Sequence, residues 1–228
     1  MDKALPLVKK PLRVDFIFDP GCPWCFIGKR RLEAALALRP NLAVERHWWP
    51  FLLNPDIPAT GIERTAYLLG KFGNESRVRE IFRAIEHAGL SAGIAFEFDR
   101  IEKMPNMIDA HRLIRYAGLE GKAEETLDRL YESYFILGLD IGETGVLMEI
   151  GEGLGLEILG LRAYLRSDED RKLIYEESAR AHRLGVGGVP TFIFNDDFII
   201  SGAQEAQTLA RVMDGAAAFQ ALSRSDFG

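Results

Sequence analysis

The stretch Asp19-Pro20-Gly21-Cys22-Pro23-Trp24-Cys25 decides the fold, because it separates two segments with different hydrophobic periods. Before it, Leu12 to Phe18 places an apolar residue at every second position, which is typical of a β-strand. After it, apolar or small residues recur at 25, 28, 32, 35 and 36 and stop at Pro40, which is typical of a helix. The sequence therefore predicts that the two cysteines lie at a strand-to-helix junction.

The junction gives the two cysteines different surroundings. Pro23 suits the first turn of a helix, where its missing N–H costs nothing, so we expect Cys22 at the helix N-terminus and Cys25 one turn further along. A thiolate at Cys22 would face unpaired backbone N–H groups and the positive end of the helix dipole, which stabilise negative charge. Cys22 is therefore the expected nucleophile and Cys25 the resolving thiol. Their spacing brings the Cα atoms to roughly 5 to 6 Å, which a disulfide bond can span.

A C-x-x-C pair has four interpretations: half of a zinc site, a redox dithiol, one reactive thiol with a neighbour, or chance. Zinc needs four ligands, and the remaining soft donors are single histidines without H-x(3–5)-H spacing, namely His47, His87, His111 and His182. We therefore predict no metal. Two cysteines in 228 residues also cannot form a disulfide scaffold. The flanking pattern favours the redox dithiol over the last two interpretations without eliminating them.

The composition narrows the range of partners. The chain is 47% hydrophobic with a formal net charge of −6, and its longest basic run is Lys29-Arg30-Arg31. Such a chain is long enough for a substantial core but lacks the electrostatic footprint of a protein that binds nucleic acid or anionic lipid. The first eleven residues carry only a short apolar patch, Ala4 to Val8, which Pro6 interrupts. We expect no nucleic-acid partner, no membrane partner and a cytoplasmic location.

A second feature lies far along the chain, where Val189-Pro190 precedes two short apolar runs. The runs Thr191 to Phe194 and Phe198 to Ser201 flank the turn Asn195-Asp196-Asp197, which predicts a β-hairpin. Pro190 cannot donate to a strand ladder, so we expect it at the start of a strand. By itself this proline predicts an ordinary trans bond, since only about 5% of such bonds are cis.

Together these motifs resemble those of the thioredoxin-like superfamily and specifically of the DsbA family. The sequence around them is most similar to the FrnE-like branch of that family. The most specific elements are C-P-W-C-x-I-G-K, from Cys22 to Lys29, and Val189-Pro190 followed by Ser201-Gly202-Ala203-Gln204. Two further segments support them, Pro50 to Pro55 and Asp109 to Leu113. The resemblance spans residues 12 to about 215.

The resemblance implies an α/β architecture, a thioredoxin-like fold with a large all-helical insertion. It assigns residues 12–59 and 185–220 to a discontinuous thioredoxin-like domain and 60–184 to a helical insertion subdomain. Three apolar stripes with helical spacing agree, at 78, 81, 82, 85 and 88, at 127, 130, 131, 134 and 135, and more weakly at 173, 174, 177, 181 and 184. Asn106 is expected near a helix start, Gly185 at a helix stop, and a second strand over 42–48.

The resemblance also implies an activity, that of a thiol-disulfide oxidoreductase. In this scheme Cys22 forms a mixed disulfide with the substrate and Cys25 resolves it, with no cofactor beyond the redox-active disulfide. Pro190 is expected to be cis and to face Cys22, which leaves the backbone of Val189 free to bind an extended substrate. The substrate would be a protein or a small-molecule thiol or disulfide.

Four nearby residues are candidates for supporting roles. Trp24 is expected to be exposed and to form part of the substrate surface, and Pro23 to influence the reduction potential. Asp19 either caps the turn, which we favour, or accepts a proton. His111 either lines the cleft from the insertion or packs in the interior.

Two other functions have to be kept. Kappa-class glutathione transferases and 2-hydroxychromene-2-carboxylate isomerase share the fold and use glutathione, but they usually have Ser in place of the first Cys. The segment Ser201 to Gln204 also lacks the Ser-Asp pair with which those enzymes hold glutathione. A binding protein or chaperone that does not use the cysteines is the third hypothesis. The resemblance further leaves open glutathione as a co-substrate and assembly as a homodimer.

Overall fold

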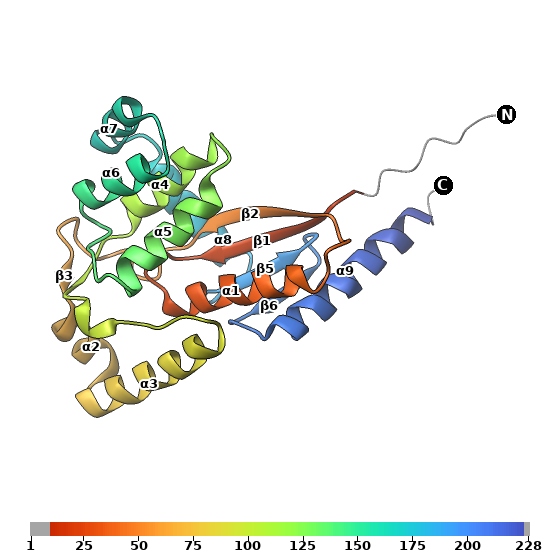
Figure 1. Cartoon of the computed structure of the whole chain (residues 1–228), viewed down its shortest axis with the longest axis horizontal. Coiled ribbons are helices and arrows are strands. Elements are labelled where there is room, and N and C mark those ends of the chain that lie inside the picture. Colours follow the sequence, from red (N-terminus) through yellow and green to blue (C-terminus); the bar gives the residue numbers. More distant parts are fainter. Residues whose placement is uncertain (1–9, 226–228) are drawn as a thin grey trace.

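The computed structural model describes residues 10–225, so the apolar patch from Ala4 to Val8 lies outside the described residues. At its centre is a four-stranded sheet with the order β2-β1-β5-β6 (Figure 1). The strands are β1 (Leu12–Phe18), β2 (Val44–Pro50), β5 (Thr191–Phe194) and β6 (Phe198–Ser201). Strand β1 pairs in parallel with β2 and antiparallel with β5, and β5 and β6 form the predicted hairpin.

Strand β1 is buried on both faces. Phe16 belongs to the main core, which includes residues of α1 (Pro23–Ala37) and α9 (Ala206–Ser225). On the opposite face, Ile17 packs in a second cluster with Ala181 of α8 (Arg171–Arg183). The alternation of apolar residues in the sequence therefore predicted the face of β1 that packs in the main core. The opposite face is buried by α8, which is distant in the sequence.

The sequence placed the second strand over 42–48, whereas β2 begins and ends two residues later. The N–H of Leu42 donates to the carbonyl of Arg39 at 3.0 Å, so this residue still belongs to the turn after α1. At the other end, Pro50 lies opposite Phe18, and pairing continues as far as β1 does. The C-terminal end of β1 thus determines where β2 ends.

The segment between β2 and β5 is mostly helical. Most of it lies beyond the end of the sheet where β1 stops and α1 begins, while its last helix, α8, packs against the sheet at β2 (Figure 1). It contains α2 (Arg64–Phe72), α3 (Glu75–Ser91), α4 (Ile108–Gly118), α5 (Ala123–Phe135), α6 (Thr144–Gly153), α7 (Ile158–Arg166) and α8, with a short 3-10 helix, η1 (Phe98–Arg100). The same segment also contains a small two-stranded sheet, which the sequence did not predict. Its strands are β3 (Ile62–Glu63) and β4 (Lys103–Met104). The fold class is confirmed, while the division at 60 and 184 stays a prediction.

Helix boundaries follow local signals in the sequence. Gly185, with φ of 86°, lies just after the C-cap of α8, as predicted for a helix stop. The Asn106 side chain accepts from the N–H of Ile108 at the start of α4.

Across residues 10–225, no helix has both the length and the apolar character needed to cross a bilayer.

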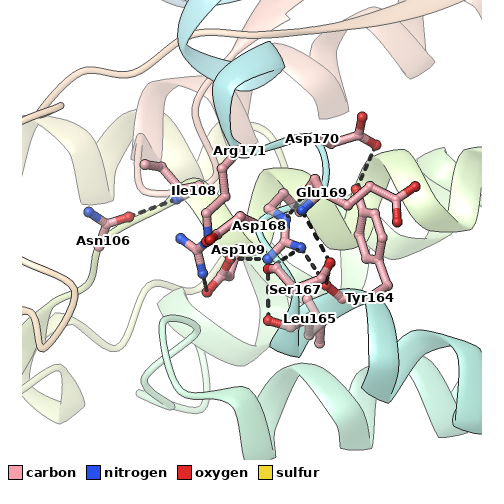
Figure 2. Close-up of polar contacts among 11 residues, drawn as sticks. Asn106, Ile108, Asp109, Tyr164, Leu165, Ser167, Asp168, Glu169, Asp170 and Arg171 are labelled. Carbon is pink, nitrogen blue, oxygen red and sulfur yellow. Dashed lines mark hydrogen bonds and ion pairs between the residues drawn. The ribbon is translucent and has the colours of Figure 1, made fainter.

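A buried arginine holds the far side of the insertion together. The guanidinium of Arg112 on α4 is fully buried, and its five N–H groups donate to Asp109 and to backbone carbonyls around the end of α7. These carbonyls belong to Tyr164, Leu165, Ser167 and Glu169. Figure 2 shows the surrounding contacts, in which Arg171 reaches Asp109 at 2.8 Å and the hydroxyl of Tyr164 donates to Asp170 at 2.9 Å.

Replacing this buried cation should cost much more stability than replacing a neighbour on the same helix. In Arg112→Met, four carbonyls and the Asp109 carboxylate lose a donor, so we expect a loss of about 3 to 5 kcal/mol in the free energy of unfolding. Arg115→Met removes a half-exposed ion pair with Asp170 and should cost about 1 kcal/mol or less. Chemical denaturation measures both. Equal losses would contradict this account.

Candidate functional site

The two cysteines lie where the sequence placed them, at the start of α1. Cys22 is the N-cap and Pro23 the first helical residue. The carbonyl of Cys22 accepts from the N–H of Cys25 at 3.0 Å, which winds the pair into one turn. Both are free thiols and both are buried, with 4% of Cys22 and 0% of Cys25 exposed.

The two sulfurs have unequal environments. Burial raises the pKa of the Cys25 thiol well above its usual range, and the adjacent Cys22 sulfur raises it further. Cys22 instead lines a cavity, and its thiol donates to the carbonyl oxygen of Val189 at 3.7 Å. One sulfur therefore faces the space that a substrate can enter, while the other keeps its proton in the core.

Val189 and Pro190 approach the cysteines from the opposite end of the chain. The Val189–Pro190 peptide bond is cis, and the carbonyl of Pro190 accepts from the N–H of Gly202 at 2.8 Å. No group in the described part of the chain accepts a hydrogen bond from the N–H of Val189. The loop therefore leaves a backbone donor unbonded at the residue whose carbonyl contacts the Cys22 sulfur.

Asp19 is buried and joins two loops. Its carboxylate accepts from the N–H of Gly21, which caps the turn, and from the N–H of Leu53, each at 2.8 Å. Burial raises the pKa of Asp19 to about 6, although these two hydrogen bonds oppose the shift. Its charge also raises the pKa of the Cys25 thiol, so the two groups interact. Asp19 is thus a turn cap whose proton equilibrium is coupled to the dithiol.

A cavity of about 330 Å³ opens beside Cys22, between the start of α1 and the insertion. Trp24, 37% exposed, lines it together with Val189. Apolar and aromatic side chains from the insertion form most of the wall, namely Leu68, Phe72, Ile81, Phe82, Ile85, Phe98, Ile101, Met104, Tyr134 and Phe135. The insertion is therefore the far wall of the site.

His111 lies elsewhere. Its Nε2 is 3.2 Å from the carbonyl oxygen of Phe51, and burial lowers the pKa of its imidazole to about 3. It lines a different cavity, of about 280 Å³, together with Trp48 and Glu177. The structure thus places His111 in the interior, as the packing alternative expects, and outside the cavity that contains Cys22.

Several residues at the site were missed from the sequence. Arg64, Tyr67 and Lys71 project from α2 into the cavity wall, and their i, i+3, i+7 spacing was the only signal available. Gly28 belongs to the C-P-W-C-x-I-G-K motif, but the sequence alone does not indicate its role. A Cβ at this position would lie 2.9 Å from Cγ of Pro190, so the glycine lets α1 approach the Val189–Pro190 loop.

No group of three or more metal-binding side chains occurs among residues 10–225. The site consists instead of two thiols, a buried carboxyl and a free backbone N–H at a cavity. Two neighbouring thiols at the N-terminus of a helix, on a sheet of this topology, place the chain in the class of thioredoxin-like proteins.

Comparison with known proteins gives the family. The chain belongs to the DSBA-like thioredoxin domain family, whose model matches residues 13–214. It is similar to the uncharacterized protein YwbO of Bacillus subtilis, with 25% identity over 81% of this chain and 87% of that protein. Among solved structures, the probable DsbA oxidoreductase SCO1869 of Streptomyces coelicolor has a TM-score of 0.82 and 27% identity, covering 90% of this chain and 89% of the other.

A 2-hydroxychromene-2-carboxylate isomerase has a TM-score of 0.67 and 16% identity, covering 95% of this chain and 99% of its own. At this identity the likeness shows the fold alone. The comparisons therefore establish a DsbA-type family and leave the reaction to be argued from the site.

A methyl group at Gly28 should disturb the site through Pro190. In Gly28→Ala the new Cβ displaces the proline ring, so we expect a loss of about 1 to 3 kcal/mol in stability and a slower reaction of Cys22 with disulfides. Gly145→Ala on α6 is the matched control, because no atom lies within 4 Å of its Cβ position. It should be neutral or stabilise by up to about 1 kcal/mol. Thermal unfolding and stopped-flow rates compare the two, and equal effects would contradict the proposed contact.

The buried carboxyl should make stability depend on pH. Because folding raises the pKa of Asp19 to about 6, its ionisation opposes folding, and stability falls as pH rises from about 4 through 6. Relative to Asp19→Asn, the wild type should lose up to about 3 kcal/mol between pH 4 and pH 7.5. Denaturation of the reduced protein at several pH values measures this. Asp56→Asn, at an exposed carboxylate, should follow the wild-type profile, and an unchanged difference for Asp19→Asn would refute the assignment.

Proposed function

We propose that this protein is a thiol-disulfide oxidoreductase of the FrnE-like branch that works through the Cys-Pro-Trp-Cys dithiol. One observation carries the proposal: the Cys22 sulfur lies at the start of α1, 3.7 Å from the carbonyl of Val189 and at the wall of a cavity. The nucleophile, a backbone docking group and space for a substrate therefore meet at one point.

The proposed reaction has two exchange steps. The Cys22 thiolate attacks one sulfur of a substrate disulfide, so that a Cys22 mixed disulfide forms and one substrate thiolate leaves. Cys25 then loses its proton and attacks the Cys22 sulfur, which releases the second substrate thiolate and leaves the Cys22–Cys25 disulfide. The enzyme dithiol has lost two electrons and the substrate has gained them. The reverse sequence oxidises a substrate dithiol.

Asp19 is the proposed acceptor of the Cys25 proton. A thiol whose pKa is raised by burial needs a nearby base before it can attack. The Asp19 carboxyl is buried with it and has a pKa of about 6, so it is mostly ionised at pH 7 and close in pKa to a useful base. The free N–H of Val189 is the proposed donor to a substrate backbone or carbonyl group.

The glutathione-dependent transferase or isomerase remains the rival hypothesis. It requires that glutathione binds in a preformed site and that activity survives the loss of Cys25. The presence of both thiols at the cavity supports dithiol chemistry instead. Glutathione as a co-substrate, a homodimer and a cytoplasmic location stay predictions.

Two cysteine variants test the mechanism. Reduced wild-type protein should reduce a model disulfide, and Cys22→Ser should lower the rate by about 1000-fold or more because the nucleophile is gone. Cys25→Ser should still attack but accumulate a mixed disulfide, which intact-mass spectrometry detects. Sustained turnover by Cys25→Ser with glutathione would favour the rival, and full activity of Cys22→Ser would favour the non-redox binding protein.

A further inference from the structure

Helix α2 adds two cations to the wall of the cavity that Cys22 opens into. Arg64 begins the helix and Lys71 lies near its end, seven residues and two turns later, so both face the same side. The remaining wall is mostly apolar and mixes aliphatic with aromatic side chains, with Trp24 near the cysteines and Phe82 and Phe98 around Arg64. A cavity with this wall favours a flat apolar group that carries a negative charge.

Arg64 has no carboxylate partner within ion-pair distance among residues 10–225. Its guanidinium lies over the ring of Phe82 at 4.8 Å and that of Phe98 at 5.9 Å. The adjacent Glu63 turns its carboxylate to the backbone N–H groups that open α2. Burial lowers the pKa of Arg64, while more distant acidic groups, including Asp99, oppose this shift. A cation is thus held in an aromatic wall without a counterion.

Lys71 is held in a similar way at the edge of the cavity. Its Nζ donates to the hydroxyl of Tyr67 at 2.8 Å and to Oδ1 of Asn54 at 3.3 Å, both of which are neutral. Within the described chain it forms no ion pair. The fully buried cations behave differently, since Lys29 contacts Asp128 at 2.8 Å and Arg112 contacts Asp109 at 2.7 Å. The two buried structural cations are in ion pairs, whereas neither cation at the cavity lies within ion-pair distance of a carboxylate of the described residues. The charge of Lys71 acts on the more distant Asp19, whose pKa it lowers.

Access to the dithiol limits the size of the substrate. Only 4% of Cys22 is exposed and Cys25 is completely buried, so a disulfide has to enter the cavity to be attacked. A volume of about 330 Å³ is at the lower end of small-molecule sites. The chain is acidic overall, with a net charge of −6, so its general field does not attract anions and local cations have to do so.

We infer, on the basis of the proposed oxidoreductase function, that the substrate is a small aromatic disulfide bearing a carboxylate, with the aromatic body against the cavity wall and the carboxylate at Arg64 and Lys71. The reduced enzyme attacks this disulfide through Cys22 and releases two aromatic thiols. Oxidation of the Cys22 and Cys25 thiols to a disulfide supplies the two electrons, and the two thiol protons pass to the released thiolates or to solvent. No other reductant is needed for this single turnover.

The test uses single turnovers of the reduced full-length protein with two aromatic disulfides. One is the dianionic 5,5′-dithiobis(2-nitrobenzoate) and the other the neutral 4,4′-dithiodipyridine. The measured quantity is the ratio of their second-order rate constants, which cancels a general loss of Cys22 reactivity. Arg64→Gln should lower the anionic-to-neutral ratio about tenfold and Lys71→Gln by a smaller factor, because each removes a charged hydrogen-bond donor. The concentration for half-saturation with the anionic probe should rise in both variants.

Two further variants separate binding from folding and from overall charge. Arg64→Lys keeps the charge in the aromatic wall and should retain most of the ratio. Arg77→Gln on α3 makes the same change in net charge outside the cavity and should leave the ratio at the wild-type value. If Arg64→Gln does not fold, as judged by circular dichroism, Lys71→Gln and Arg64→Lys still decide the question.

The results that would overturn the anion site differ from those that would overturn the oxidoreductase function. A ratio that changes less than twofold in Lys71→Gln and Arg64→Gln, or an equal fall in Arg77→Gln, overturns the anion site while Cys22-dependent reduction stands. Faster reduction of insulin than of the anionic disulfide under the same conditions indicates a protein substrate and also overturns it. Wild-type protein that reduces none of these disulfides overturns both the inference and the oxidoreductase.

Discussion

The contact between the first turn of α1 and the Val189–Pro190 loop is the constraint on which the site depends. It joins residues 167 positions apart through the Cys22 thiol and the Val189 carbonyl, and it exists because β5 pairs directly with β1. Gly28 permits the close approach of helix and loop, since any larger residue would meet Pro190. The central sheet therefore serves function by bringing one loop and one helix end to the same place.

Much of this framework was predictable, because it follows from local chemistry. A period-two strand, a proline in the first turn of a helix and a proline before a hairpin each give a signal that neighbouring residues do not override. The family resemblance added the split fold and the pairing of Cys22 with the Val189–Pro190 segment. Where local signals were weak, as at the limits of β2, pairing with β1 decided the result.

The roles of individual polar residues were harder to predict, because they depend on tertiary contacts. Asp19 was expected to cap its turn, but its second bond, to Leu53, becomes visible only when the segment after β2 lies beside the turn. His111 lies on α4, which lines the other cavity and not the one beside Cys22, and its sequence neighbours do not show this placement. Arg64 and Lys71 lie on an ordinary amphipathic helix, and the absence of an ion-pair partner for either one among residues 10–225 is a property of the packing around them.

Burial of the dithiol connects its acid–base chemistry with its choice of substrate. The same low-dielectric surroundings that raise the pKa of the Cys25 thiol raise the pKa of Asp19 toward neutrality, which suits the role of base proposed for this carboxylate. The insertion contributes to those surroundings, because its side chains line the cavity through which Cys22 is reached. A change in the insertion that opened the site would therefore alter proton transfer and selectivity together. The insertion is better understood as part of the active site than as a cover added to a complete thioredoxin fold.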